Sequence, residues 1–371
     1  MSQIAQIVQN LDSLTACVHT VATTEDELLS QKNKSKTPFI GVDLLGGDNH
    51  HPEFLLETVY NLFDKVDDPF CLLFFVTPDV RYQMENFEQL HSQVLPKDAL
   101  LYCDVEEVIH MDDDPLLSVR RKKHSSMAIA MNLLKEKKLD ALVTTGNTGA
   151  LIASTKMYLP MLDGISRSAL ITLLPTKKSP VAVIDVGANI ECTPENLVQF
   201  AQMGIAYQNS RGIPHPKVGL LNIGSEEKKG RRELRETYKL LQKFNLPDKD
   251  PIFIGNVEGK EIFSGNIDVL VTDGFTGNVF LKTSEGISAF ILETLHENES
   301  ILPFSKAILS RLEKELYSAE YPGAILCGVD GIILKCHGDA SSEALTCGLK
   351  GAISLINGRF LAKMTRQLKN P

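Results

Sequence analysis

Short apolar runs alternate with longer, helical-looking segments from Phe39 onward. The runs are rich in Val, Ile and Leu, and they read FIGVDLL, CLLFFVT, ALVTTG, ALITLLP, PVAVIDVG, KVGLLNIG, PIFIGNVEG, IDVLVTDG and GIILKCHG. Because these runs are continuously apolar rather than alternating, they predict strands that are buried on both faces. With helices between them, they predict an α/β fold in which a mostly parallel sheet is sandwiched by helices.

Two segments depart from this pattern. Residues 1–36 carry apolar side chains at alternating spacings of three and four, which predicts an N-terminal extension of one helix and a linker. The helix has almost no Lys or Arg on its polar face, so we expect it to dock on protein rather than on a membrane. Residues 285–322 predict a helical excursion, two helices around ENESILPF, from the α/β domain that spans 37–371.

Most of the predicted strands end in Gly, Asn, Asp or Ser. These turns read LGGD (45–48), TTGNTGA (144–150), DVGANIE (185–191), NIGSEEKKG (222–230), GNVEG (255–259), DGFTGN (273–278) and CHGDASS (336–342). In an open α/β sheet, ligands bind outside the carboxyl ends of the strands. Glycine lets the backbone approach a ligand closely, and helix N-termini present N–H groups to anions. The turns therefore predict a site for phosphate or carboxylate.

The stretch VTDGFTGNVFLKTSEG (271–286) illustrates such a turn. We expect it to turn on Asp273-Gly274 and again on Gly277-Asn278, and then to continue as a helix. TTGNTGA lacks the spacing of a Walker loop, which argues against a nucleotide triphosphatase. It suits an anion cradle with Thr145, Asn147 and Thr148, and it equally suits a strand-to-helix turn capped by Asn or Thr.

Charged residues in these turns also have two interpretations. In NIGSEEKKG, acids and bases form either a solvated face or a site bracketed by Gly224 and Gly230. Asp43, Asp185 and Asp273 follow or end strands, and a carboxylate trio suits Mg²⁺, although capping of neighbouring turns is the favoured interpretation. A Ser nucleophile in CHGDASS has little support, because the chain has no GxSxG elbow.

Composition narrows the function further. The chain has 371 residues, is 43% hydrophobic and carries a net charge of −9, which indicates a globular protein and argues against nonspecific nucleic-acid binding. Seven cysteines at irregular spacing show no metal-finger pattern, and the N-terminus does not resemble a signal peptide. We therefore expect a cytoplasmic protein with reduced thiols. Its one run of four consecutive bases, at 120–123, is either solvated or suited to an acidic partner.

Taken together, the turns resemble one family closely: the bacterial acyl-acyl-carrier-protein:phosphate acyltransferases of phospholipid synthesis. The stretches that carry the resemblance are VDLLGGD, MDDDPLLSVRRKKHSSM, TTGNTGALIA, DVGANIECTPENLVQFAQMG, VGLLNIGSEEKKG, FIGNVEG, VTDGFTGNVFLKTSEG and ILKCHGDASS. The chain departs from the usual family pattern at Leu44-Leu45, at Glu191 and at Asp339, and none of these departures removes a charge from the central motifs.

The resemblance implies a fold like that of phosphate acetyltransferases and isocitrate/isopropylmalate dehydrogenases. It also implies transfer of a long-chain acyl group from acyl carrier protein to inorganic phosphate, with an acyl phosphate as the product for acylation of glycerol 3-phosphate. No cofactor and no metal are expected. The family is homodimeric and associates peripherally with membranes, so the apolar tip at 301–304 has three candidate partners: the membrane, the acyl chain and a second copy.

The chemistry of this reaction fits a chain without an evident catalytic triad. Phosphate is itself the nucleophile and is largely dianionic at pH 7, and the leaving thiol has a pKa of about 8.5. What remains is to hold the anion and to stabilise the oxyanion. By match to the family motifs, Lys229 and Asn278 are the candidate catalytic residues.

Further candidate residues follow from the turns and from the basic run at 120–123. Candidates for substrate or phosphate binding are Gly46, Gly47, Asp48, Gly146, Asn147, Thr148, Gly149, Asn189, Asn256, Gly277 and His337. Candidates for docking of the acidic carrier protein are Arg120, Arg121, Lys122 and Lys123.

Three other functions stay open. A phosphate acetyl- or butyryltransferase that uses acyl-CoA needs a pocket for the adenosine 3′-phosphate, and the sequence does not identify one. A dehydrogenase of the related fold needs an adenine site and metal carboxylates that are not apparent. A non-catalytic anion-binding sensor does not require Lys229 and Asn278, and both are present.

Overall fold

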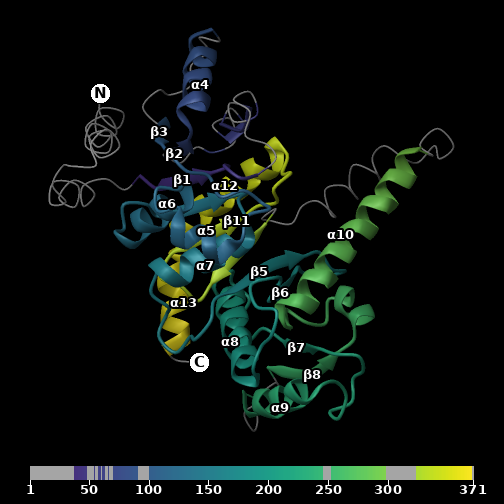
Figure 1. Ribbon diagram of the computed structural model, residues 1–371. Coiled ribbons are helices and arrows are strands. Elements are labelled where there is room, and N and C mark those ends of the chain that lie inside the picture. The colour runs from purple at the N-terminus through teal and green to yellow at the C-terminus, as the bar shows by residue number, and fades with distance from the viewer. Residues whose placement is uncertain are drawn as a thin grey trace. The chain divides into compact units, whose positions relative to one another are not determined.

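The computed structural model describes residues 37–47, 70–90, 100–244, 252–297 and 323–369, together with a few positions between 54 and 66. Within these ranges the chain forms two compact units, one drawn from residues 1–160 and 329–361, the other from 161–328 and 362–371. Figure 1 shows strands and helices alternating along the chain in both units.

The first unit holds five parallel strands. They are β1 (Phe39–Asp43), β2 (Cys71–Val76), β3 (Leu100–Asp104), β4 (Ala141–Thr144) and β11 (Ile332–Lys335), in the order β3-β2-β1-β4-β11. Its helices are α4 (Pro78–Leu90), α5 (Pro115–Arg121), α6 (Ser126–Lys135), α7 (Thr148–Tyr158) and α12 (Ser342–Asn357). Helix α6 packs against β1 and β4, and α12 packs against β4 and β11.

The second unit holds a mixed set of strands. They are β5 (Ala169–Leu174), β6 (Val181–Ile184), β7 (Val218–Leu221), β8 (Phe253–Val257), β9 (Val269–Val271) and β10 (Ala324–Cys327), in the order β10-β5-β6-β9-β7-β8. Strand β5 is antiparallel to β6 and β10, whereas β6, β9, β7 and β8 are parallel to one another.

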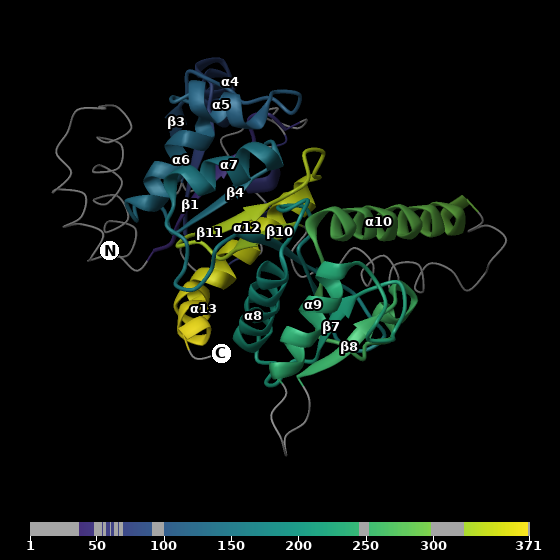
Figure 2. The same cartoon turned by 60° about the horizontal axis from the view of Figure 1, so that its bottom comes forward.

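Helices pack against these strands as well. They are α8 (Pro194–Ser210), α9 (Arg232–Leu241) and α10 (Gly274–Glu297), with short 3-10 turns η2 (Gln242–Phe244) and η3 (Gly259–Ser264). Helix α8 packs against β6 and β9, and α9 packs against β8, as Figure 2 also shows for α9. The C-terminal helix α13 covers Phe360–Lys369.

The apolar runs of the sequence correspond to the strands. Every residue of β1, β2, β4, β5, β6, β9 and β11 is buried, as expected for strands covered on both faces. The mostly parallel α/β architecture is therefore confirmed. Strands β3 and β10 were not predicted; β3 is partly open to solvent, and its sequence LLYCD is not continuously apolar.

Several helices begin where a side chain caps the first turn. The predicted Asn cap is confirmed, because the side-chain Oδ1 of Asn147 accepts from the N–H of Ala150. At the start of α6, the Ser125 hydroxyl accepts from the N–H of Ala128. In α8, Thr193 forms a capping box with Asn196 just ahead of Pro194.

Helix α10 differs from the expectation. It begins at Gly274 and runs unbroken to Glu297, so the second turn that we expected at Gly277-Asn278 was wrong: both residues lie inside the helix. The rest of the predicted excursion, its tip at 301–304 and the N-terminal extension 1–36 lie outside the described residues. Among the described residues, no helix has the length and apolarity needed to cross a bilayer.

Gly277 allows α10 to begin this close to β6. A Cβ atom placed on Gly277 would lie 1.9 Å from the backbone oxygen of Asp185, much closer than van der Waals contact allows. We predict that Gly277→Ala lowers the free energy of unfolding by about 1–3 kcal/mol, because the helix must shift away from the strand.

Gly286 in the same helix is the matched control. It is exposed, and a Cβ there meets no atom within 4 Å. Gly286→Ala should leave stability unchanged or raise it by up to about 1 kcal/mol, since Ala has the higher helix propensity. Urea denaturation of both variants measures the difference, and equal effects would contradict the close packing at Gly277.

Candidate active site

The carboxyl ends of three adjacent parallel strands meet in the first unit. The N–H of Thr145 after β4 donates to the carbonyl of Asp43 in β1 (3.0 Å), and the N–H of Cys336 after β11 donates to the carbonyl of Thr144 (2.9 Å). A Cβ on Gly47 would lie 2.4 Å from the Thr145 hydroxyl oxygen. The turns that follow β1, β4 and β11 therefore lie along one edge of the sheet.

A buried charge cluster supports this edge. Asp43 is almost fully buried, and burial raises the pKa of its carboxyl to about 6, against the opposing effects of hydrogen bonds and of the Lys335 charge. The Thr144 hydroxyl donates to Asp43 Oδ2 (3.1 Å) and accepts from the N–H of Gly146 (3.0 Å). Lys335, also buried, donates through Nζ to the carbonyls of Thr145 (3.2 Å) and Cys336.

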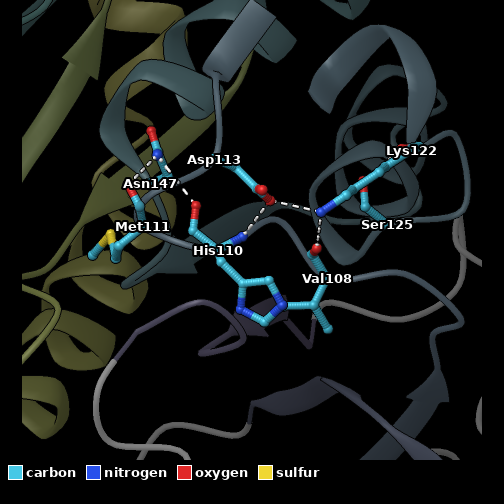
Figure 3. Close-up of polar contacts among 7 residues, drawn as sticks. All are labelled: Val108, His110, Met111, Asp113, Lys122, Ser125 and Asn147. Carbon is cyan, nitrogen blue, oxygen red and sulfur yellow. Dashed lines mark hydrogen bonds and ion pairs between the residues drawn. The ribbon is translucent and has the colours of Figure 1, made fainter. Parts of the chain in front are cut away.

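Asn147 is occupied by structural hydrogen bonds. Besides capping α7, its side-chain amide donates to the carbonyls of His110 (3.3 Å) and Met111 (2.9 Å), as Figure 3 shows. Its side chain thus fastens the segment 108–113 to the turn after β4. The capping interpretation of TTGNTGA is confirmed for Asn147, and phosphate contact by its side chain is disfavoured.

Lys122 belongs to the same network. Its Nζ donates to Asp113 Oδ2 and to the carbonyl of Val108, both at 2.6 Å, and Asp113 Oδ2 also accepts from the N–H of His110 (2.9 Å; Figure 3). The hydrogen bond from Lys122 holds the pKa of Asp113 below its usual value. Of the four predicted docking residues, Lys122 is therefore used in hydrogen bonds within the protein, whereas Arg120, Arg121 and Lys123 are exposed.

The remaining candidates of the first unit take different places. Gly46 lies against the carbonyl of Ile109, Thr148 is the first residue of α7, and Gly149 packs against Pro115. His337 is half-buried after β11. Asp48 lies outside the described residues.

Two serines beside His337 have structural partners. Ser341 caps α12 by accepting from the N–H of Ala344 (3.2 Å), and the Ser342 hydroxyl accepts from the Asn61 amide (3.0 Å). Their contacts agree with the low support for a Ser nucleophile.

In the second unit, the carboxylate of Asp185 organises the turn after β6. One carboxylate oxygen accepts from the N–H groups of Leu170, Gly187 and Ala188 at 3.0–3.2 Å. The other accepts from the N–H and the side-chain amide of Asn189 at 2.7 and 2.8 Å. Burial raises the pKa of Asp185, while these hydrogen bonds act in the opposite direction.

This turn supports the start of α10. The carbonyl of Asn189 accepts from the N–H of Gly274 (2.7 Å). Asp273 caps the helix, because its Oδ1 accepts from the N–H of Thr276 (2.7 Å) and its Oδ2 accepts from the Thr276 hydroxyl (3.0 Å). The N–H of Gly277 donates to the carbonyl of Asp273 (2.9 Å), so this N–H is used inside the helix.

The loop after β7 carries Lys229 and is held at its base by two amides. Asn222 donates to the carbonyl of Lys229 (3.2 Å) and to Asn256 Oδ1 (3.1 Å), and Asn256 donates to the carbonyl of Glu226 (2.8 Å). Gly230 has φ +82°, and a Cβ there would lie 2.4 Å from Asn222 Oδ1, so only glycine fits beside this amide.

These contacts separate the candidate asparagines into two groups. Asn147, Asn189 and Asn256 are buried, and their amides are used in hydrogen bonds to the protein. Asn278 is exposed one turn into α10, and across the described residues its side chain has no such partner. It lies close to Gly187 of the Asp185 turn.

Lys229 is similarly open to solvent. Its Nζ lies 3.8 Å from Glu226 Oε1, a loose ion pair, and about half of its side chain is exposed. Strands β7 and β9 are hydrogen-bonded neighbours and run parallel. The loop that carries Lys229 and the helix that carries Asn278 therefore leave the same edge of adjacent strands.

The aspartates favour capping over metal binding. Asp43, Asp185 and Asp273 are engaged in the turn hydrogen bonds given above, and no group of three or more His, Cys, Asp or Glu side chains suited to a metal ion occurs in the described ranges.

Three residues of these edges were not among the predicted site residues: Lys335, Asn222 and Arg231. Lys335 had a signal, since a charged residue ends the apolar run GIILK. Arg231 follows Gly230 directly, and its Nη2 lies 2.5 Å from Asp273 Oδ2.

Asp43 gives a pH dependence of known sign. With a folded pKa of about 6 and an unfolded value of about 3.9, the folded state binds more protons between these values, so stability falls as pH rises through this window. A shift of about 2 units corresponds to roughly 3 kcal/mol. We predict that, as pH rises from 4 to 7, the free energy of unfolding of Asp43→Asn increases by about 3 kcal/mol relative to that of the unsubstituted chain. Denaturant titrations at several pH values measure it, and a pH-independent difference would contradict the assignment.

Solved structures with a similar fold include phosphotransacetylases. The enzyme from Streptococcus pyogenes aligns with a TM-score of 0.56 and 13% identity, covering 94% of this chain and 100% of that one. The EutD phosphotransacetylase from Staphylococcus aureus aligns with a TM-score of 0.53 and 15% identity, covering 98% and 99% of the two chains. At these identities the likeness shows the fold, which agrees with the expected class.

Sequence relatives are closer. A phosphate acyltransferase from Chlamydia pneumoniae is 36% identical over 334 residues, which cover 89% of this chain and 98% of the relative. A phosphate acyltransferase from Fusobacterium nucleatum is 42% identical over 291 residues, 76% and 86% of the two chains. A family model described as fatty acid synthesis protein matches residues 39–363. The chain belongs to the phosphate acyltransferase family, whose members are acyltransferases of fatty acid and phospholipid synthesis.

Proposed function

We propose that the chain transfers a fatty acyl group from the thioester of an acyl carrier protein to inorganic phosphate, and that the acyl phosphate serves acylation of glycerol 3-phosphate. The observation that carries the proposal is the pair Lys229 and Asn278. In a chain of the phosphate acyltransferase family, these are an exposed amine and an exposed amide at the ends of adjacent parallel strands. Such donors suit an anion and a developing oxyanion.

The reaction needs charge stabilisation more than proton transfer. An oxygen of the phosphate dianion forms a bond to the thioester carbon, and the carbonyl oxygen becomes an oxyanion. When the tetrahedral intermediate collapses, the C–S bond breaks and the thiol sulfur takes up the proton that the phosphate carried. We assign neutralisation of the phosphate or of the oxyanion to Lys229, and hydrogen-bond donation to one of these oxygens to Asn278.

Exposed apolar side chains in the turns of the second unit support an acyl substrate with a long chain. Ile190, Ile223 and Phe275 are 74%, 82% and 63% exposed. Ile190 lies in the turn after β6, Ile223 lies in the loop after β7, and Phe275 lies in the first turn of α10; hydrogen bonds and the Arg231–Asp273 ion pair join these segments. Large apolar groups in such polar turns suit an aliphatic chain. This favours a fatty acyl donor over acetyl-CoA.

The carrier protein is the proposed macromolecular partner. Arg120, Arg121 and Lys123 are exposed, and α5 also exposes Leu116 and Leu117. A surface with cationic and apolar groups suits an acidic protein, because complementary charges steer association. Homodimer formation, a cytoplasmic location and peripheral contact with a membrane, which the family resemblance implies, belong to the same proposal.

Activity of two single variants tests the proposal. We expect Lys229→Ala and Asn278→Ala to fold with unchanged thermal midpoints, since both side chains are exposed, and to lose ~10²–10³ in kcat. The acyl phosphate is trapped with hydroxylamine and measured with two acyl donors, a carrier protein loaded with a long-chain fatty acyl group and acetyl-CoA. Lys228→Ala is the control, because Lys228 is the exposed neighbour of Lys229. Normal rates in both variants, or a preference for acetyl-CoA, would refute the proposal.

Docking is tested by charge reversal. We expect Arg120→Glu combined with Arg121→Glu to raise KM for the acyl carrier protein by about tenfold at low salt, with little change in kcat. The increase should shrink as ionic strength rises. Lys363→Glu combined with Arg366→Glu, on α13, reverses the same number of exposed charges elsewhere and should leave KM unchanged. An equal rise in both double variants would place docking on another surface.

A further inference from the structure

Arg231 occupies a position where its side chain does not stabilise the helix that it begins. It is the N-cap residue of α9, and its side chain makes no capping hydrogen bond. Ser, Thr, Asp and Asn are the residues that stabilise this position, because their short side chains accept from the first turn. The guanidinium of Arg231 instead reaches Asp273, 42 residues further along the chain, with Nη2 2.5 Å from Oδ2.

Asp273 is a fixed partner for this guanidinium. Its side chain is only 7% exposed, whereas that of Arg231 is 66% exposed. The carboxylate is held by Thr276 in the first turn of α10, through both the backbone N–H and the hydroxyl. An exposed pair of two mobile side chains contributes little, but here one partner is immobilised by its helix, so the ion pair fixes where Arg231 lies.

The two ends of this ion pair belong to the segments that carry Lys229 and Asn278. Arg231 follows Lys229 by two residues, and Asp273 precedes Asn278 by five. The amides of Asn222 and Asn256 hold the loop to its own strands β7 and β8. The Arg231–Asp273 ion pair ties the end of the loop to the turn between β9 and α10.

We propose that Arg231 is a positioning residue, whose ion pair with Asp273 fixes the loop of Lys229 relative to Asn278. The inference rests on the proposed function, since Lys229 and Asn278 are its candidate catalytic residues. Misplacement of a reacting group by a fraction of an ångström to an ångström lowers turnover more than binding. Breaking the ion pair should therefore reduce kcat and leave KM for phosphate nearly unchanged.

Two substitutions break the ion pair and keep the local structure. Arg231→Asn places a preferred capping residue at the start of α9. Asp273→Asn keeps an oxygen that can accept from the N–H of Thr276 at the start of α10. Neither variant should lose thermal stability. We expect each to lower kcat at least about tenfold, with KM for phosphate changed less than about twofold.

A double-mutant cycle separates positioning from other roles. If the residues act through each other, the double variant is no slower than either single variant. Arg231→Lys should recover part of the activity, because it keeps the charge. Arg232→Asn is the matched control: it breaks the exposed pair with Glu236 (2.7 Å) one residue away and should leave kcat unchanged.

Hydrogen exchange gives a readout that does not depend on activity. We expect amide exchange in residues 223–230 to become faster in Arg231→Asn and in Asp273→Asn, but not in Arg232→Asn. Unchanged exchange, additive losses in kcat, or a loss confined to KM for phosphate would overturn the positioning role; the last result would indicate direct contact with phosphate. If the unsubstituted protein forms no acyl phosphate, the proposed function fails, and exchange alone decides whether Arg231 orders the loop.

Discussion

The buried carboxylate of Asp185 is the constraint on which the second unit depends. A buried carboxylate is costly unless hydrogen bonds satisfy it, and here backbone and side-chain N–H groups surround both oxygens. These bonds fix the turn after β6, and the carbonyl of Asn189 in that turn receives the first N–H of α10. Gly277 then allows the helix to rest on the backbone of Asp185. The place of Asn278 follows from this packing.

Most polar side chains in the strand-end turns build the turns themselves. Asn147 acts in this way in the first unit, and Asn189 and Asn256 do so in the second. Once these groups are satisfied by the protein, few donors remain for an anion. A site built in this way is rigid before substrate arrives, and rigidity is what stabilisation of a transition state by fixed donors requires.

The sequence predicted most of the strands because buried parallel strands are continuously apolar, a local property. Strand β3 was not predicted because it is partly open to solvent, so its sequence LLYCD is not continuously apolar. The roles of individual polar residues were harder to predict. Lys122 was predicted to belong to a surface charge run, but it pairs with Asp113, nine residues away in the sequence. Asn256 donates to the carbonyl of Glu226, 30 residues away. Hydrogen bonds of this range depend on the folded chain. The catalytic roles of Lys229 and Asn278 stay predictions.

The central claim is that phosphate attacks the carrier thioester directly, aligned by fixed donors, without an acylated residue of the protein. The most direct test mixes unlabelled carrier protein that bears a fatty acyl thioester with isotope-labelled carrier protein that has a free thiol, with enzyme and without phosphate. The measured quantity is the rate at which the acyl group moves to the labelled carrier protein. Direct attack predicts no exchange above the uncatalysed rate, because the acyl group leaves its thiol only when phosphate accepts it. Exchange at a rate comparable to turnover would contradict the account, since the acyl group would then leave its thiol without phosphate, as a covalent acyl-enzyme intermediate predicts.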